Sequence, residues 1–473
     1  MVDSNLLGLA EGLYPPFNDL LWTMERRGVY VSTDELRRVE SEATTSIQQA
    51  AASLDTFAGE PKNWNANTSD VAWFLYDHLG LPELPDEARG PKHWGKERIT
   101  AHEALEYFHR HHPERREEID TLRQYRRACR ARNYATDLLE RSRPTEWPGI
   151  GTVHPTYGTY NDNSQGKQRD KTGTATGRLS ISNPPLQQIP RDKKKDPYRV
   201  RRAFVAPPGQ RLCVVDLEQL EVRIQAHIHI ALFGDTTLRD FCTAGDFHGL
   251  IAHHVFSRIW PTFADHVEPR WLPNWKKNLR LKTGWDAVLP DEIKDHYDPK
   301  IRWCRDQVKA VFYGLAYGKG EKAFGSTLWT IEGNPIGTET ARALMQGIYD
   351  KIPAIPKFDG WVEQVVWDKG GMPDLFGVWR PVTKDKRGVR QAKNTPMQGT
   401  GARLAALWML LLRGFEQRLQ VHDELLITAD EDKAEETVKQ VEAAAAEVGE
   451  IVGMKCPLKA KGGHGLTWDE GKS

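Results

Sequence analysis

In the middle of the chain, four apolar residues are followed directly by an aspartate in the stretch Leu212-Cys213-Val214-Val215-Asp216. A later stretch has apolar residues on both sides of a polar tip and reads Leu419-Gln420-Val421-His422-Asp423-Glu424-Leu425-Leu426-Ile427. Short apolar runs of this kind predict buried strands, and the second stretch predicts a hairpin whose turn projects its acid. The sequence therefore predicts two carboxylates, Asp216 and Asp423, at the tips of buried strands.

Two carboxylates from distant segments are what a two-metal site needs. Mg²⁺ prefers carboxylate and phosphate oxygens, and two ions about 4 Å apart can clamp the attacking and leaving oxygens of a phosphoryl transfer. An acid in an ordinary turn is the alternative. For Asp216 or Asp423 taken alone, that alternative would be the better interpretation.

A strongly helical segment, about 301–317, carries two faces. Residues four apart drift only about 40° per step around a helix, so one face carries Arg305, Lys309, Tyr313 and Tyr317. A separate apolar stripe, centred roughly 130° away, predicts a buried face made of Val308, Val311, Phe312 and Leu315. Cations bind phosphates and rings stack on bases, so the first face suits a nucleoside triphosphate. A solvated basic face with incidental tyrosines is the alternative.

The bulk composition is that of an ordinary globular chain. Of 473 residues, 39% are hydrophobic and 27% charged, which excludes a disordered or membrane-embedded chain. The longest apolar run, 405–412, is too short to span a bilayer, and the start of the chain lacks a secretory signal. Five scattered cysteines without a Cys-x-x-Cys pair indicate reduced thiols. We therefore expect a cytoplasmic protein without membrane contact.

Basic and acidic residues both number 65, so any binding to nucleic acid must come from local basic faces. One such face lies on a predicted helix and consists of Arg123, Arg126, Arg127 and Arg130. A second cluster consists of Lys193, Lys194, Lys195, Arg199, Arg201 and Arg202. Taken alone, either cluster is more often a solvated surface.

Six motifs, in one order along the chain, resemble those of family A DNA polymerases, the DNA polymerase I type. One stretch resembles the first catalytic motif of the family and reads Asp216-Leu217-Glu218-Gln219-Leu220-Glu221-Val222-Arg223. A second stretch resembles the family's fingers-helix motif and reads Arg305-x₃-Lys309-x₃-Tyr313-Gly314-x₂-Tyr317-Gly318. Residues 420–425 resemble the third motif of the family. Three more stretches agree: 174–190, 246–248 and 394–400. The resemblance covers most of the chain from about 150 onward, with weaker likeness at 24–29 and 65–82.

The resemblance implies an α+β, multi-domain right-hand fold, in which the palm is built on an antiparallel sheet and the fingers and thumb are helical. Residues 1–28 would be an N-terminal palm-associated segment, and 29–190 the thumb with its connection to the palm. The palm would follow at 191–223 with the first catalytic motif. The fingers would occupy 224–390, and the palm would resume at 391–473 with the second catalytic acid.

The function that this family implies is template-directed, DNA-dependent DNA synthesis. A primer would be extended 5′→3′ by two-metal phosphoryl transfer, with a DNA primer–template duplex and dNTPs as partners. Two Mg²⁺ ions, for which Mn²⁺ could substitute, would be held by Asp216, Asp423 and the carbonyl of Leu217. Lys309, counted with the two acids as catalytic, could donate a proton to the leaving pyrophosphate or act electrostatically.

Other positions take their expected roles from the same resemblance. The incoming nucleotide would contact Arg305, Lys309, Tyr313, Tyr317, His248, Gln219 and Glu221. Within this set, Glu221 would crowd the ribose 2′ position and Tyr317 would stack at the templating position. Primer and template would contact Arg178, Asn394, Gln398, His422 and Glu424, and the thumb would grip duplex through Arg123, Arg126, Arg127 and Arg130.

The sequence departs from the family pattern at several points. Glu218 replaces a small serine, Leu217 an aromatic residue and Phe312 a polar one. The interval between Asp246 and Lys309 is longer than the family needs. We interpret its surplus, the Trp-rich stretch 257–299, as packing on the fingers; a docking surface for a replisome protein and a strand-separating element are the alternatives.

The palm and thumb pattern begins almost at Met1, so we expect an exonuclease-free enzyme without proofreading. We also expect a monomer. Such a short form suggests phage-type DNA replication, in the host cytoplasm. The alternatives are a repair or translesion polymerase of the same family, or a fragment. A single-subunit RNA polymerase shares the palm acids, but Glu221 argues against it. A catalytically inactive DNA-binding subunit is the alternative from another class, and the retention of Asp216, Asp423 and the 305–317 face argues against it.

Overall fold

The structure of the protein is a computed structural model that describes residues 4–65, 69–85, 89, 93, 95–159, 174–191, 196–243, 248, 251–252, 254–256, 299–328, 330 and 335–471. The basic residues 193–195 and nearly all of the Trp-rich stretch 257–299 lie outside these described residues.

A four-stranded antiparallel sheet forms the palm. Its order is β11–β6–β10–β9, and the strands are β6 (Gln210–Leu217), β9 (Glu416–Val421), β10 (Glu424–Asp430) and β11 (Ala460–Gly465). β10 pairs with β6 so that Glu424 lies opposite Asp216. The two acid-bearing stretches are therefore neighbouring strands. β6 is longer than the predicted 212–215, because pairing with β11 continues past Asp216 to Leu217.

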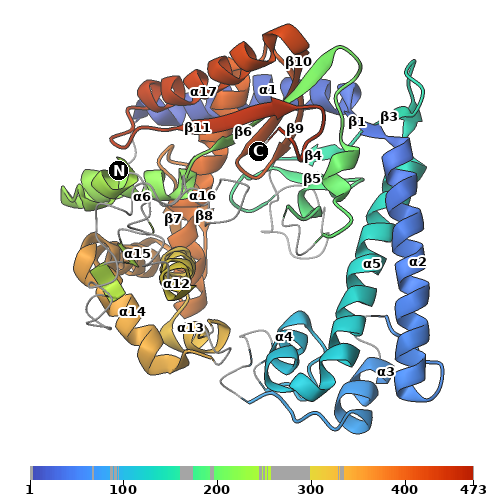
Figure 1. The fold of residues 1–473 in the computed structure, drawn as a ribbon. Coiled ribbons are helices and arrows are strands. Elements are labelled where there is room, and N and C mark those ends of the chain that lie inside the picture. Colours follow the sequence, from blue (N-terminus) through green and yellow to red (C-terminus); the bar gives the residue numbers. More distant parts are fainter. Residues whose placement is uncertain are drawn as a thin grey trace, which may run out of the picture.

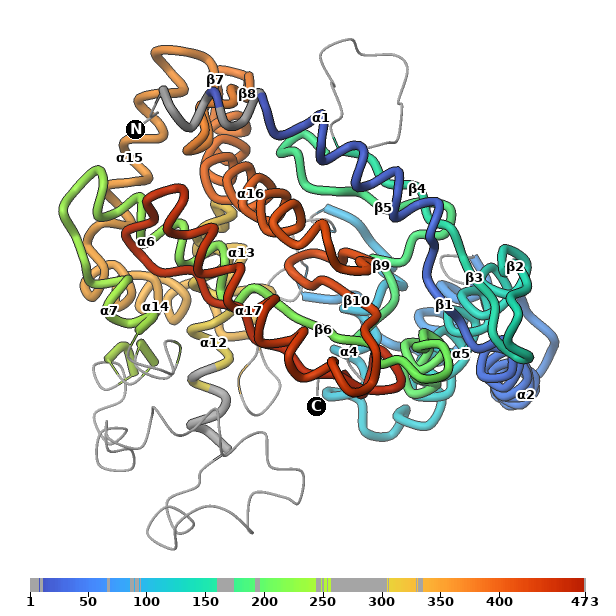
Figure 2. The backbone as a smooth tube through the Cα atoms, turned by 90° about the horizontal axis from the view of Figure 1, so that it is seen from above, coloured from blue at the N-terminus to red at the C-terminus, as the bar shows by residue number. Residues whose placement is uncertain are grey.

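Helix α17 (Ala434–Ile451) packs against β6 and β11 on one face of this sheet. The side chain of Cys213 points to this face, because its thiol donates to the carbonyl of Ala434 at the start of the helix. Side chains alternate along a strand, so Asp216 belongs to the opposite face. The long helix α16 (Lys386–Leu411) is fastened to α17 where the indole of Trp408 donates to the carbonyl of Val441 at 2.9 Å. Helix α1 (Ser4–Arg27) lies beside α16 (Figure 2).

The thumb is a pair of long packed helices, α2 (Thr33–Ala58) and α5 (Arg116–Arg141) (Figure 1). Ser32 begins α2 by accepting the Glu35 amide at 3.2 Å, and Gly59 ends it in a left-handed conformation (φ 79°). The tip consists of α3 (Ser69–Ala72), a π-helical turn (Trp73–His78) and α4 (His102–His111). It has its own apolar cluster, which includes Trp64, Phe74, Phe108, Ile119 and Leu122.

Small sheets connect the thumb to the palm. β1 (Val29–Ser32), β3 (Ile150–Val153) and β2 (Arg143–Pro144) form one of them, in the order β1–β3–β2. β4 (Thr156–Gly158) and β5 (Ser180–Ser182) form another.

The fingers are helical and enclose a second apolar core. They comprise α6 (Leu220–Phe233), α7 (Thr237–Thr243), α12 (Pro299–Ala316), α13 (Glu321–Thr327), α14 (Gly337–Lys351), α15 (Ala354–Lys369) and the hairpin of β7 (Gly371–Pro373) with β8 (Trp379–Pro381). The predicted apolar stripe of α12 is confirmed, because Val308, Val311, Phe312 and Leu315 are all buried. Gly314 lets α13 approach closely, since a Cβ there would lie 2.4 Å from the Phe324 ring.

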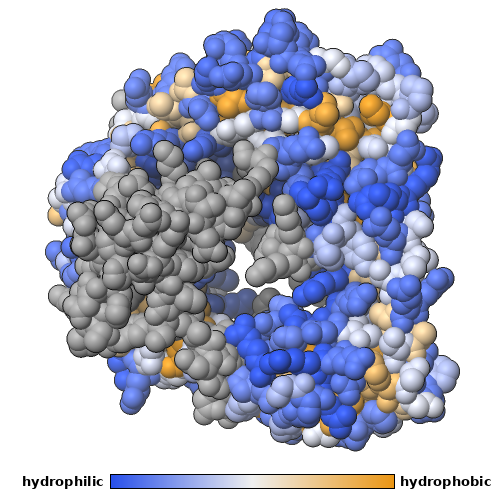
Figure 3. Space-filling view, in the orientation of Figure 1, coloured by the Kyte–Doolittle hydropathy of each residue, from blue (hydrophilic) through white to orange (hydrophobic). Residues whose placement is uncertain are grey.

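Palm, thumb and fingers surround a central space (Figure 1). The space-filling view shows a hollow there, bordered on the thumb side by hydrophilic residues (Figure 3). Within the described part of the chain, no helix combines the length and the apolar character that crossing a bilayer demands.

Candidate active site

The structure brings Asp216 and Asp423 together at one end of the palm sheet. Asp423 lies in the two-residue turn between β9 and β10. The amide of Leu217, the residue after Asp216, donates a 2.8 Å hydrogen bond to the carbonyl of Asp423. Both acids are partly exposed, so the two predicted metal ligands lie next to each other and are open to solvent.

The backbone beside each acid takes an uncommon conformation. Gln219 and His422 are both left-handed, with φ of 53° and 58°. Non-glycine residues rarely adopt this conformation, and those that do are concentrated at functional sites. Among the described residues the buried side-chain oxygen of Gln219 has no hydrogen-bond partner, so this predicted nucleotide contact has an unused acceptor.

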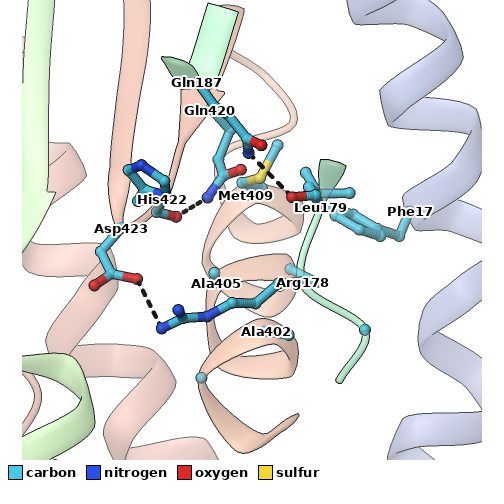
Figure 4. A pocket seen from close by; sticks show the side chains of 13 residues that line it. Phe17, Arg178, Leu179, Gln187, Ala402, Ala405, Met409, Gln420, His422 and Asp423 are labelled. Atoms are coloured by element: carbon cyan, nitrogen blue, oxygen red, sulfur yellow. Dashed lines mark hydrogen bonds and ion pairs between the residues drawn. The ribbon is translucent and has the colours of Figure 1, made fainter. Parts of the chain in front are cut away.

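Arg178 provides positive charge at the acids. Its guanidinium lies 4.0 Å from the carboxylate of Asp423 and forms an ion pair with Glu221. Burial alone would lower the pKa of Arg178, but Glu221 and Asp423 outweigh it and raise that pKa. Figure 4 shows Arg178 reaching toward Asp423 across a small cavity, with Phe17 of α1 on the far side. At about 30 Å³, the cavity has room for roughly one water molecule.

Glu221 lies in the first turn of α6 and links several segments of the site. Besides Arg178, it receives the hydroxyl of Tyr317, which lies 3.1 and 3.2 Å from its two oxygens. The Tyr317 hydroxyl accepts the side-chain amide of Gln398 at 3.3 Å. Four predicted site residues from four segments thus form one hydrogen-bonded group.

The polar face of α12 is turned toward this group. Lys309 and Tyr317 are exposed, whereas Tyr313 is half-buried and its ring centre lies 5.6 Å from that of His248. Burial, with the negative charges of Glu221 and Asp423, raises the pKa of Tyr313 to about 12. Arg305 also lies on α12, but its side chain is outside the described part of the structure. The structure therefore gathers Tyr313, Tyr317 and His248 beside the acids, and Lys309 lies on α12 one helical turn before Tyr313.

His422 and Glu424 flank Asp423 but differ in environment. Desolvation and the nearby Arg178 and Arg201 lower the pKa of His422, so its imidazole is neutral at pH 7. Glu424 is buried, and it accepts the indole N–H of Trp468 at 2.6 Å and the guanidinium of Arg201 at 3.5 Å. The polar turn predicted from the sequence therefore consists of His422 and Asp423 only, without Glu424. Glu424 belongs to β10 and to the palm interior, and it does not join the other predicted primer and template contacts at the surface.

The four predicted thumb arginines do not share one open face. Arg123 pairs with Glu106 at 2.6 Å and Asp120 at 3.1 Å. Arg126 donates to the carbonyl of Thr100 at 2.6 Å, and burial lowers its pKa. Both arginines therefore hold the thumb together. Arg127 lines a pocket beside Tyr198, and Arg130 is exposed, so the expected grip on duplex rests on these two.

Sequence reasoning missed three arginines beside Tyr317. Arg380, Arg387 and Arg390 line a pocket of about 430 Å³, together with the predicted Asn394 and Gln398. Guanidinium groups and side-chain amides of this kind suit a nucleic-acid backbone. A sequence signal existed, because Arg387, Arg390 and Asn394 are spaced by three and four residues and thus share one face of α16.

The donor atoms fit a pair of divalent cations. Asp216 and Asp423 present hard carboxylate oxygens side by side, and the Arg178 guanidinium near Asp423 shows that a cation is favourable there. In the described part of the chain no group of three or more His, Cys, Asp or Glu could hold a metal alone. A backbone carbonyl, water and phosphate oxygens would therefore have to complete the coordination.

Comparison with known proteins identifies the family of the chain. The model of DNA polymerase family A matches residues 33–264 and 294–470. The thermostable DNA polymerase I of Thermus thermophilus is 30% identical over 98% of this chain and 49% of its own length. The DNA polymerase I of Pseudomonas aeruginosa is 27% identical over 96% of this chain and 43% of its own. The chain thus spans about half the length of the curated relatives it matches.

A solved structure shares the fold. It is the POL domain of Pol1 from M. smegmatis in complex with DNA primer-template and dNTP, with a TM-score of 0.74 and 24% identity, and the match covers 97% of this chain and 70% of that one. The predicted right-hand fold of palm, fingers and thumb is thereby confirmed. The family model covers well over half of the chain, so the protein belongs to the family A DNA polymerases.

Proposed function

We propose that this protein is a template-directed DNA polymerase that extends a primer 5′→3′ by two-metal phosphoryl transfer. The observation that carries the proposal is the adjacency of Asp216 and Asp423, joined through the 2.8 Å hydrogen bond between Leu217 and Asp423. Membership of the family supports the same reaction.

In this proposal Asp216 and Asp423 hold two Mg²⁺ ions, with the carbonyl of Leu217 as a further ligand. Bound Mg²⁺ supplies activation of the primer hydroxyl and neutralisation of charge on the phosphates. Lys309 and Arg305 bind the triphosphate, and Lys309 stabilises the charge that develops on the leaving pyrophosphate.

The remaining residues position the substrates. Neutral His422 can hydrogen-bond the primer end without adding charge, and Gln219 offers its unused acceptor to the nucleotide. We assign the pocket of Arg380, Arg387 and Arg390 to the template strand, since cations there would follow phosphates without reading sequence. The solved Pol1 relative, which holds DNA primer-template and dNTP, supports these partners.

The test is primer extension on a long single-stranded template with dNTPs, with and without Mg²⁺. We expect extension with Mg²⁺, none after chelation and partial recovery with Mn²⁺. Binding of duplex without any extension would instead support an inactive DNA-binding subunit.

The finer predictions from the sequence stay predictions: phage-type replication, monomeric state, cytoplasmic location and replisome docking on 257–299. The absence of proofreading also stays a prediction. A mismatched 3′-terminal primer with Mg²⁺ and no nucleotides should keep its full length, and progressive shortening by the homogeneous protein would refute it.

A further inference from the structure

The C-terminal segment, residues 466–471, turns back across the palm sheet after β11 (Figure 1). The amide of Trp468 donates to the carbonyl of Phe204 at 3.0 Å. Gly471 lies against β6, since a Cβ on this glycine would come within 2.6 Å of the Val214 side chain. Side chains alternate along a strand, so Val214 and Asp216 point to the same face. The C-terminal segment therefore covers the face of the sheet that carries Asp216.

Trp468 is the buried anchor of this segment. Its side chain is only 1% exposed, and its ring packs edge-on against that of Phe204, with ring centres 5.1 Å apart. The indole N–H donates to the carboxylate of Glu424 at 2.6 Å, and the guanidinium of Arg201 lies 3.9 Å from the centre of the indole ring. The same guanidinium donates to Glu424 at 3.5 Å. An indole and an arginine packed on it thus hold one buried carboxylate.

Glu424 stands where a third metal-binding carboxylate could be. It follows Asp423 directly in the chain, and on β10 it lies opposite Asp216 of β6. Opposite residues of antiparallel strands point to the same face, with Cβ atoms about 5 Å apart. Yet among the residues that the structure describes, no three acids, histidines or cysteines are placed to hold a metal together. The Glu424 carboxylate therefore lies beside the two acids but is held toward Trp468.

The number of carboxylates at the metals matters for two-metal chemistry. The reaction needs ions that keep coordination positions open for substrate oxygens. A further carboxylate on either ion would fill such a position and draw the ion away from the place that Asp216 and Asp423 set. It would also bind a cation more tightly, because affinity rises with the number of charged ligands. A third carboxylate would thus favour metal binding and oppose catalysis.

We propose that Trp468 is a positioning residue that keeps the Glu424 carboxylate out of the metal site. The inference rests on the proposed function, since it takes Asp216 and Asp423 as the metal ligands. Hydrogen bonds to a charged group are stronger than those between neutral groups, so the short bond from the indole N–H fixes the carboxylate in the palm interior. Without that bond, the carboxylate turns toward a cation held by Asp216.

The test is Trp468→Phe, which keeps an aromatic ring for Arg201 to pack on and removes the N–H. Mn²⁺ is titrated into the free protein, and unbound Mn²⁺ is measured by electron paramagnetic resonance. The Kd for Mn²⁺ should fall by about threefold or more, because a third carboxylate joins the site. The maximal single-turnover rate of nucleotide addition with Mg²⁺ should fall about tenfold, and the dNTP concentration for half the maximal rate should stay within about twofold.

Two further proteins show whether Trp468 acts through Glu424. In a Glu424→Gln background, Trp468→Phe should change neither quantity, because the amide brings no charge to the metals. Trp408→Phe is the matched control: it removes the N–H of another tryptophan of the palm that is 1% exposed and donates to a backbone carbonyl, that of Val441. It should bind Mn²⁺ and add nucleotides like the wild type, even where urea unfolding shows a similar loss of stability.

The proposal requires both changes in Trp468→Phe, tighter Mn²⁺ binding and slower nucleotide addition. The absence of either change, weaker Mn²⁺ binding, or equal effects in the Glu424→Gln background would overturn it. Glu424→Gln alone decides the question if Trp468→Phe does not fold: its Kd for Mn²⁺ should stay within about twofold of wild type, and a larger increase would make Glu424 a metal ligand. A wild type that neither binds Mn²⁺ nor extends a primer would overturn the proposed function and this inference with it.

Discussion

The hydroxyl of Tyr317 lies 3.1 and 3.2 Å from the two carboxylate oxygens of Glu221, so the residue that follows α12 is hydrogen-bonded directly to the first turn of α6. The same carboxylate forms an ion pair with Arg178, and Gln398 donates to the same hydroxyl at 3.3 Å. Glu221 is the acceptor that holds Tyr317, and in the proposed function it would also be a wall at the sugar 2′ position. Changes in its size and in its charge should have separable effects.

Glu221→Ala should admit ribonucleotides. Removal of the side chain opens space at the sugar 2′ position, and discrimination between deoxy- and ribonucleotides should fall at least tenfold, about 1.4 kcal/mol. Glu221→Gln is the matched control, because it keeps the size and should keep most of the selectivity. Single-nucleotide incorporation of dNTP and rNTP measures both variants. Unchanged selectivity in the alanine variant would show that another residue excludes ribonucleotides.

Asp216→Ala and Asp423→Ala should each abolish nucleotide addition and leave duplex binding nearly intact. The metals need these carboxylates, whereas affinity for DNA comes mostly from phosphate contacts. We expect a rate below about a thousandth of wild type, a loss of more than about 4 kcal/mol. Asp432→Ala, an exposed acid on the same palm, should be fully active. A higher residual rate in either variant would contradict the metal assignment.

The sequence predicted the central strands of the palm and the buried face of α12, because strand and helix periods are local properties. The stretches 212–216 and 419–427 formed the expected neighbouring strands, and the apolar stripe of α12 was buried as its spacing predicted. The proximity of Asp216 to Asp423 could be expected from these strands together with the family resemblance.

What the sequence could not predict depends on tertiary partners. Glu424 looks like a member of a polar tip, but Trp468 and Arg201 draw it into the palm interior. Arg123 looks like part of a basic face, but Glu106 neutralises it within the thumb. In both cases the partner lies on another element, and no periodicity within one helix or hairpin reveals it.

A buried ion pair links α16 to the turn between β7 and β8, since Arg403 lies 2.5 Å from Asp374 and both are almost fully buried. Arg403→Leu should destabilise the protein by about 3–5 kcal/mol, because it leaves a carboxylate buried without its partner. In an Asp374→Asn background the same change should cost much less, since the amide carries no charge. Urea unfolding of the four proteins measures the coupling, and additive losses would show that the pair acts only by packing.

His229 should make stability depend on pH. It is fully buried in α6, neither ring nitrogen has a partner among the described residues, and burial lowers its pKa to about 4. The unfolded chain binds this proton below about pH 6.5 and the folded protein does not, so stability is lost as pH falls from about 6.5 to 4. The full loss is about 3 kcal/mol.

His229→Leu should therefore flatten this dependence. Apparent Tm at pH 7.5 and pH 5 should differ less in the variant than in the wild type. His464→Gln, at an exposed histidine, should behave like the wild type. Equal pH dependence in all three proteins would show that His229 finds a partner when charged.

Tyr313 gives a prediction about the 3′ position of the incoming sugar. Its ring lies beside His248, and its pKa is raised to about 12 by burial and by the carboxylates around it, so the hydroxyl keeps its proton. Among the described residues no hydrogen bond is formed by that hydroxyl, and it can act as a donor or an acceptor.

A dideoxynucleotide lacks the 3′-hydroxyl and leaves its former partners unsatisfied, which costs about 1–3 kcal/mol for a buried polar group. The Tyr313 hydroxyl can fill that position and a phenyl ring cannot. We therefore expect the wild type to use dideoxynucleotides within about tenfold of normal substrates, and Tyr313→Phe to widen the gap by a further ten- to hundredfold. Tyr349→Phe, a matched change elsewhere in the fingers, should alter nothing. Competition between dTTP and dideoxy-TTP in primer extension measures the ratio. Equal discrimination by wild type and Tyr313→Phe would mean that the hydroxyl does not reach the sugar and that the tyrosine acts only as an aromatic spacer.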